Sequence, residues 1–151
     1  MAGQVGSVSY APDVANAEAT APRVVYNFYN GTAATIADGH AVMIDKDVTT
    51  HGLGTAIKTN VDEDGKLVVG FADEAIPTLS WGKVIVYGIK VGVTGTGSIS
   101  VGELVQADAA TAGQVQGAEL TGDDVHEAHT MGTALTASGD GETLTVWVQM
   151  R

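Results

Sequence analysis

The sequence predicts an all-β fold, namely a small β-barrel or sandwich with a degenerate internal repeat and an extended N-terminal arm. Short apolar runs alternate with polar residues at the period of a strand, and no long stretch follows the 3.6-residue period of a helix. Twenty glycines stand against three prolines and 5% aromatic residues, a composition typical of many short strands joined by tight turns. We therefore expect less than about 15% helix.

Nine strands are expected, beginning at Arg23 and separated by turn pairs such as Asn30-Gly31 and Asp140-Gly141. In the last strand, Leu144 and Val146 share one side, which indicates a half-buried strand. The expected ranges lie near 23–29, 40–45, 54–59, 66–72, 83–93, 101–107, 113–117, 130–136 and 142–150.

Two halves of the chain share a pattern. Residues 36–42 align with residues 99–105 at an offset of 63, and residues 69–72 align with residues 131–134 at an offset of 62. Each aligned pair is followed by a valine-rich strand. We interpret these matches as pseudo-repeats of about 33–93 and 96–150 within a single all-β domain that spans 23–151.

Residues 1–22 differ from the rest, because they are small and polar and have no period. We interpret them as an extended or disordered arm. We expect the arm to become ordered on a partner, by adding a strand to an exposed sheet edge. Its isolated apolar residues are the candidate anchors, namely Val5, Val8, Tyr10 and Val14.

Four residues of the domain complete the set of candidate contacts with a partner protein or a neighbouring protomer. Val24, Tyr26 and Phe28 alternate along the first strand. Trp81 follows Pro77 and Ser80 in what the sequence indicates is a loop. Two interpretations of Trp81 stand: an interface anchor, or a plug that closes the end of a barrel.

Two acidic segments have some features of metal sites. Residues 60–65 open like a calcium-binding loop, but the twelfth position, where a bidentate Glu is required, is Phe71. The second segment, near residues 121–132, reads as a loop followed by a strand, in which positions three apart point to opposite faces. Its possible ligands are Asp123, Asp124, His126, Glu127 and His129. We expect neither segment to hold a metal.

No pattern of catalytic residues is present. Residues 95–98 are rich in glycine but lack the following Lys and the third Gly of phosphate-binding loops. No nucleophile elbow occurs, and the carboxylates lie mainly beside glycines in expected turns. We therefore expect a protein that is not an enzyme and that needs no cofactor.

Net charge and composition limit the classes of partner that we expect the chain to bind. The chain has 18 acidic and 7 basic residues, a net charge of −11, which disfavours binding to nucleic acid. The chain has no cysteine, so disulfides and thiolate zinc sites are excluded. No window holds the roughly 18 consecutive apolar residues of a membrane helix, so we expect no membrane partner.

The C-terminal third resembles a known family. Residues 131–137, followed by the valine-rich strand that ends near Val148, resemble the closing hairpin of the capsid decoration (cement) proteins of tailed bacteriophages. Residues 99–105, followed by Gly113-Gln114-Val115, are similar to the middle section of that family. The resemblance covers about residues 33–150.

This resemblance implies a function as well as an all-β fold. Members of the family bind the outer surface of an assembled capsid, brace it against internal DNA pressure and are often trimers. The implied partners are the major capsid protein and further copies of this chain in a homotrimer. The implied location is the outer capsid surface of the virion, after synthesis in the host cytoplasm.

A second interpretation is a β-domain of a phage fibre or bacterial surface protein that binds glycans or the host surface. It requires an aromatic platform with nearby amides or acids, and the chain's two tryptophans are Trp81 and Trp147.

Overall fold

A computed structural model describes residues 21–48, 51–52, 54, 56–59, 67–108, 110–118 and 130–149. Across this part of the chain every regular element is a strand, so the predicted all-β fold is confirmed. No helix there is long and apolar enough to cross a membrane.

Each of the nine strands lies within a few residues of an expected range. Their bounds are β1 Val24–Asn30, β2 Ala41–Ile44, β3 Ala56–Thr59, β4 Val68–Ala72, β5 Trp81–Thr94, β6 Leu104–Ala107, β7 Val115–Gly117, β8 Thr130–Ala134 and β9 Thr143–Gln149.

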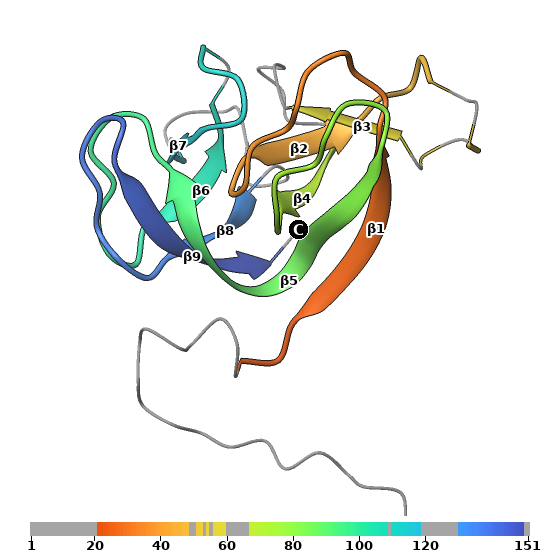
Figure 1. The fold of residues 1–151 in the computed structure, drawn as a ribbon. Helices are drawn as coiled ribbons and strands as arrows, with labels where there is room; N and C mark the ends of the chain where they lie inside the picture. The colour runs from red at the N-terminus through yellow and green to blue at the C-terminus, as the bar shows by residue number, and fades with distance from the viewer. Residues whose placement is uncertain are drawn as a thin grey trace, which may run out of the picture.

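Lobe 1 is a closed five-stranded barrel formed by β1 to β4 and the first half of β5 (Figure 1). The strand order is β1-β3-β2-β4-β5. The barrel closes because β1 pairs with β3 in parallel and with β5 in antiparallel orientation, so each of its five strands is paired with a neighbour on both sides. The buried apolar residues of its interior are Ile36, Val42, Ile57, Ala72, Ile76 and Val84.

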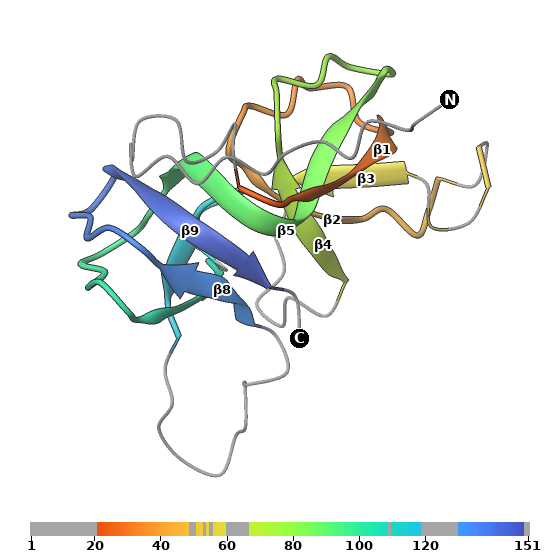
Figure 2. The ribbon, with the colours of Figure 1, turned by 90° about the horizontal axis from the view of Figure 1, so that it is seen from below.

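Lobe 2 consists of the second half of β5 followed in space by β9, β8, β6 and β7. The chain after β5 returns to β7 through a parallel bridge between Gly95 and Val115, and the Thr96 N–H donates to the Val115 oxygen at 2.7 Å. Figure 2 shows the two lobes side by side, with the curved β5 running through both.

The two lobes repeat one pattern of strand pairing. Val42 pairs with Gly70 in lobe 1 and Val105 with Gly132 in lobe 2, and a register shift follows each pair. The same correspondence holds along the next ladder, where β4 pairs with β5 and β8 with β9. All these positions correspond at an offset of 62 or 63 residues, so a residue of one lobe has a structural equivalent in the other.

The outer face of lobe 1 is buried at the joint between the lobes. Ala41, Phe71 and Ile85 are fully buried and belong to the same apolar cluster as the interior of lobe 2. The lobe 2 residues at the equivalent positions are only half-buried: Leu104, Thr133 and Trp147. The face that lobe 1 buries at the joint is therefore partly exposed to solvent in lobe 2.

Charged side chains add to the joint. The Lys90 ammonium lies 2.8 Å from the Asp38 carboxylate and 4.0 Å from that of Asp73. Arg23 contacts the same Asp73 carboxylate at 3.1 Å. Because Lys90 belongs to the half of β5 that pairs with β9 and both aspartates belong to lobe 1 loops, this network ties one lobe to the other.

Candidate functional site

An exposed apolar cluster lies at the far end of lobe 1, which we call the lobe 1 tip (residues 77–81 with Tyr29 and His51). Tyr29 is the cross-strand partner of Trp81, and their ring centroids lie 5.7 Å apart at 61°. The His51 ring lies 4.1 Å from Tyr29 and 5.6 Å from Trp81. Trp81 is still 52% exposed, so these contacts position the indole without covering it.

Leu79 is even more exposed than Trp81. It is 63% exposed and, among the described residues, it is the only non-glycine residue with a positive φ, at 51°. A left-handed conformation costs a residue with a Cβ roughly 1–2 kcal/mol. Glycine, which has no Cβ, would adopt this backbone conformation at a lower free-energy cost, yet an exposed leucine occupies the position.

Lobe 2 identifies the residue that this position ordinarily takes. At an offset of 62, Gly141 is the equivalent of Leu79, and its φ is 71°. Glycine adopts positive φ without a steric penalty. The same backbone turn thus occurs in both lobes, and only lobe 1 places a large apolar side chain on it.

A buried amide holds the lobe 1 tip in place. The Asn30 amide nitrogen donates to the carbonyl oxygens of Ile76 and Pro77, at 3.1 Å each, while its oxygen accepts from the Thr32 hydroxyl at 2.8 Å. The Thr78 hydroxyl then donates to the Thr32 oxygen at 2.6 Å. These bonds fix the loop that carries Leu79, so little conformational freedom remains to be lost when a partner binds.

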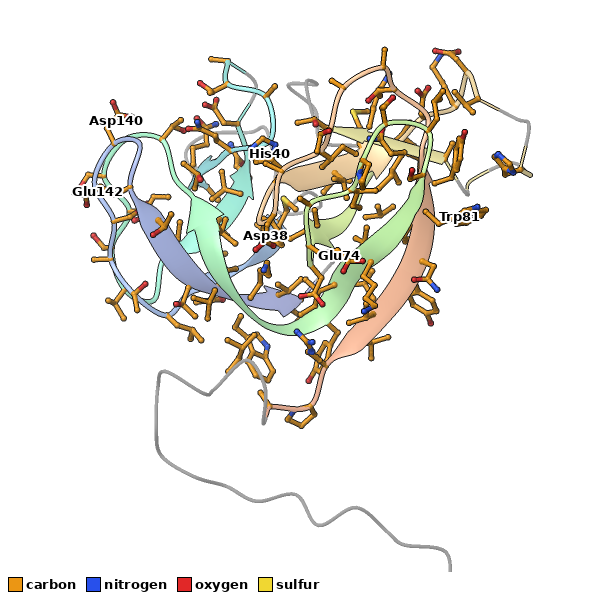
Figure 3. All side chains as sticks on the ribbon, viewed as in Figure 1. Asp38, His40, Glu74, Trp81, Asp140 and Glu142 are labelled. Carbon is orange, nitrogen blue, oxygen red and sulfur yellow. The ribbon has the colours of Figure 1, made fainter. Side chains whose placement is uncertain are left out.

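The equivalent loop of lobe 2, residues 139–143, is polar and acidic. The Asp140 carboxylate accepts from the Gly97 N–H at 3.0 Å, and the Glu142 carboxylate accepts from the Gly139 N–H at 2.8 Å. Figure 3 shows Trp81 at one end of the molecule and Asp140 and Glu142 at the other. The two tips of one repeated fold thus present opposite chemistry to solvent.

Charge is distributed as unequally as apolar surface. Residues 23–94 contain six basic and eight acidic residues, a net of −2, whereas residues 95–149 contain eight acidic and no basic residues, a net of −8. Among the residues that the structure describes, lobe 2 has four acidic side chains and no Lys or Arg, whereas lobe 1 with β5 has five of each sign, so the described part of lobe 2 is the more negative.

A second exposed apolar area lies where β1 begins. Tyr87 is the cross-strand partner of Val24 and stacks edge-on against Trp147 at 5.5 Å. Val24 and Tyr87 are both 41% exposed. This area lies near the middle of β5, close to the joint between the lobes.

The predicted contact residues fall in different places. Val24 and Tyr26 are exposed on β1. Phe28 is half-buried and packs against the interior of lobe 1, so it has a core role as well. Trp81 begins β5 rather than lying in a loop, because its pairing with Tyr29 extends the ladder past the point where the alternating pattern stops. The arm anchors Val5, Val8, Tyr10 and Val14 lie outside the described residues.

Acidic and histidine side chains are the possible metal ligands of this chain. Both acidic segments that the sequence raised, 60–65 and 123–129, lie outside the described residues. In the part that is described, no three His, Asp or Glu side chains form a group that could hold a metal ion.

His40 is the histidine at the joint between the lobes (Figure 3). Its Nδ1 is buried and makes no hydrogen bond within the described part of the chain. Burial lowers the pKa of His40 below its ordinary value of 6.5. A Cβ at Gly113 would lie 2.5 Å from this nitrogen, so the imidazole fills the space that the glycine leaves.

No protein-family model and no curated protein sequence matches the chain. Among solved structures, its fold is similar to the crystal structure of the head fiber gp8.5 N base in bacteriophage phi29, with a TM-score of 0.57 and 12% sequence identity. The similarity covers 83% of this chain and 95% of that chain. Such coverage exceeds what one lobe provides, so the shared fold extends across both lobes.

Proposed function

We propose that this protein is a structural component of a tailed-phage head, and specifically a decoration protein that binds the outer surface of the capsid and stabilises it. The observation that carries the proposal is the similarity of fold, over 83% of the chain, to the base of a phage head fiber. The sequence resemblance of residues 33–150 to capsid decoration proteins supports the same function independently of the coordinates.

The physical properties of the chain suit this role. A net charge of −11 keeps the protein soluble before assembly and away from packaged nucleic acid. We assign the chain no enzymatic activity and no cofactor, because its function would reside in its area of contact with the shell. Many identical copies on one shell would multiply a modest affinity at each site.

The proposed partners are the major capsid protein and two further copies of the chain in a homotrimer on the outer capsid surface. A trimer suits a threefold position on a shell, because each contact is then repeated by symmetry. Sedimentation equilibrium at micromolar concentration tests this part alone, since a strict monomer both in solution and on heads would contradict it.

Co-sedimentation with empty heads tests the function. We expect the protein to pellet with heads in a saturable manner, at a fixed ratio to the major capsid protein, and to raise the temperature at which full heads release DNA. A protein that stays in the supernatant at micromolar concentration, with heads present in excess, would refute the proposal.

The exposed rings of the lobe 1 tip favour a second candidate, a glycan-binding β-domain. Sugar rings stack on flat aromatic faces, whereas the three rings of the tip are inclined to one another by 52° to 67°. Trp147 packs against Tyr87 and does not join this cluster. A glycan array with the intact protein separates the candidates, because the decoration function predicts no bound glycan.

A further inference from the structure

We propose that the lobe 1 tip is the surface that faces the capsid, and that the Leu79 side chain enters an apolar recess on the assembled major capsid protein. This inference rests on the proposed decoration function and adds to it the orientation of the protein on the shell. It is carried by the backbone of Leu79, by the rigidity of its surroundings and by the distribution of charge.

The first argument is the conformation of Leu79. Lobe 2 shows that this turn accommodates glycine, yet lobe 1 has a leucine at φ 51° that is 63% exposed. Strain kept at an exposed position commonly marks a residue that acts on a partner. Because the Leu79 side chain is mostly exposed, it contributes little to the stability of lobe 1. A partner that binds this side chain would give the strained conformation a function.

The second argument is that the lobe 1 tip is built to present Leu79. The hydrogen bonds of Asn30 and Thr78 hold the loop, and the Tyr29 and His51 rings position Trp81 beside it. A rigid aromatic residue next to an apolar side chain is the composition of an interface anchor. On the capsid, Trp81 would lie at the edge of the Leu79 contact and would help to exclude water from it.

The third argument is electrostatic. In the described part of the chain, lobe 2 has four acidic side chains and no Lys or Arg, whereas lobe 1 with β5 has five acidic and five basic side chains. Asp140 and Glu142 lie at the end opposite Trp81 (Figure 3). Docking through the lobe 1 tip buries the less charged end and leaves the acidic end in water, where its charges remain solvated.

The same features favour a protein recess over the other occupants. A glycan offers no pocket for an exposed aliphatic side chain such as that of Leu79. A second copy of this chain that docked tip to tip would bring an identical exposed leucine rather than a recess to receive it. The partner surface is therefore apolar, concave and part of the capsid.

Two variants test the proposal by titrating labelled protein onto empty heads. Leu79→Gly installs the residue that lobe 2 has at this turn, and Leu79→Asn keeps a Cβ while tolerating positive φ. Both should retain or raise the melting temperature, and both should weaken head binding at least tenfold, which is about 1.4 kcal/mol. If only the glycine variant weakens binding, the cause is loop flexibility and the proposal is wrong.

Val101→Ser is the matched control, because Val101 is a 66% exposed apolar residue of lobe 2. We expect this variant to bind heads within twofold of the wild type. Equal binding by the wild type and both Leu79 variants would overturn the orientation and leave the decoration function standing. A wild type that does not bind heads would instead refute the proposed function itself.

Sedimentation of the free variants tests the remaining occupant. We expect Leu79→Gly to keep the oligomeric state of the wild type. Dissociation of the oligomer by this substitution would show that the tip contacts another copy of the chain, and would overturn the proposal.

Discussion

The two lobes share a fold but not a surface. The ladder from β2 through β4 to β5 recurs as β6, β8 and β9 with the same partners and the same register shifts. Where the lobes differ, the difference lies at the joint and at the tips. Leu79 and Gly141 occupy equivalent backbone positions, but only Leu79 places an apolar side chain there. Positions with similar residues in both lobes are therefore those that maintain the fold. Positions at which the lobes differ are the candidates for a role outside the fold.

The largest effect should come from the joint. Phe71 is fully buried against lobe 2, whereas its equivalent Thr133 is half-buried. We expect Phe71→Ala to lower the free energy of unfolding by about 3–5 kcal/mol and Thr133→Ala to lower it by less than about 1 kcal/mol. Urea unfolding measures both. Equal losses would mean that the two faces are equally packed.

A second matched pair compares glycines. Gly39 and Gly102 both have positive φ, at 78° and 85°, and each donates its N–H to the equivalent alanine oxygen of its lobe. A Cβ at Gly39 would lie 2.2 Å from the Gly92 oxygen, whereas a Cβ at Gly102 meets nothing within 4 Å.

Alanine at Gly102 should therefore cost only the backbone strain, about 1 kcal/mol, while alanine at Gly39 should cost about 2 kcal/mol more. Thermal unfolding of the two variants under identical conditions checks this. A Gly102→Ala variant that is the less stable of the two would contradict the close approach of Gly39 to Gly92.

The charged network of the joint should have a smaller effect. Lys90 is buried, but Asp38, one of its partners, is largely exposed, so water moderates the loss of the pair. We expect Lys90→Met to cost about 1–3 kcal/mol. Lys46 and Asp47 form an exposed pair, and Lys46→Ala should change stability by less than about 0.5 kcal/mol. If Lys90→Met and Lys46→Ala lowered stability equally, the Lys90 network would stabilise the joint no more than an exposed ion pair does.

The smallest expected effect is the pH dependence contributed by His40. Its pKa is lower in the folded protein than 6.5, so on acidification the unfolded chain takes up this proton first. Stability from His40 is therefore complete above pH 6.5 and declines as the pH falls below it. Asp38, Asp73 and Lys90 also lie at the joint, and a variant that replaces only His40 leaves these three groups in place.

The matching measurement compares the melting temperatures of the wild type and His40→Gln between pH 7.5 and pH 5.5. The wild type should lose more, because glutamine does not titrate. Parallel curves would exclude His40 as the source.

Local patterns in the sequence predicted most of this fold. Alternation and glycine turns located all nine strands, because period and turn chemistry are properties of neighbouring residues. The parallel pairing of β1 with β3 was not predicted, since it joins segments that lie far apart in the chain and have no common signal.

The candidate site was predicted only in part. Trp81 was singled out, but its contacts with Tyr29 and His51 depend on the register of β1 against β5, which composition does not reveal. Leu79 was missed, because a leucine gives no sign of positive φ. Extending the offset of 62 residues as far as Gly141 would have found it, since a glycine followed by a polar residue in one copy marks the turn in the other.

The central claim is that the unequal tips orient the protein on a phage head, and a cryo-EM reconstruction of decorated heads tests it most directly. The account predicts density for the two lobes on the outer surface, with Leu79 and Trp81 against the shell and the Asp140–Glu142 tip pointing into solvent. Density that places the acidic tip against the shell would contradict the account, as would heads that carry no added density at saturating protein.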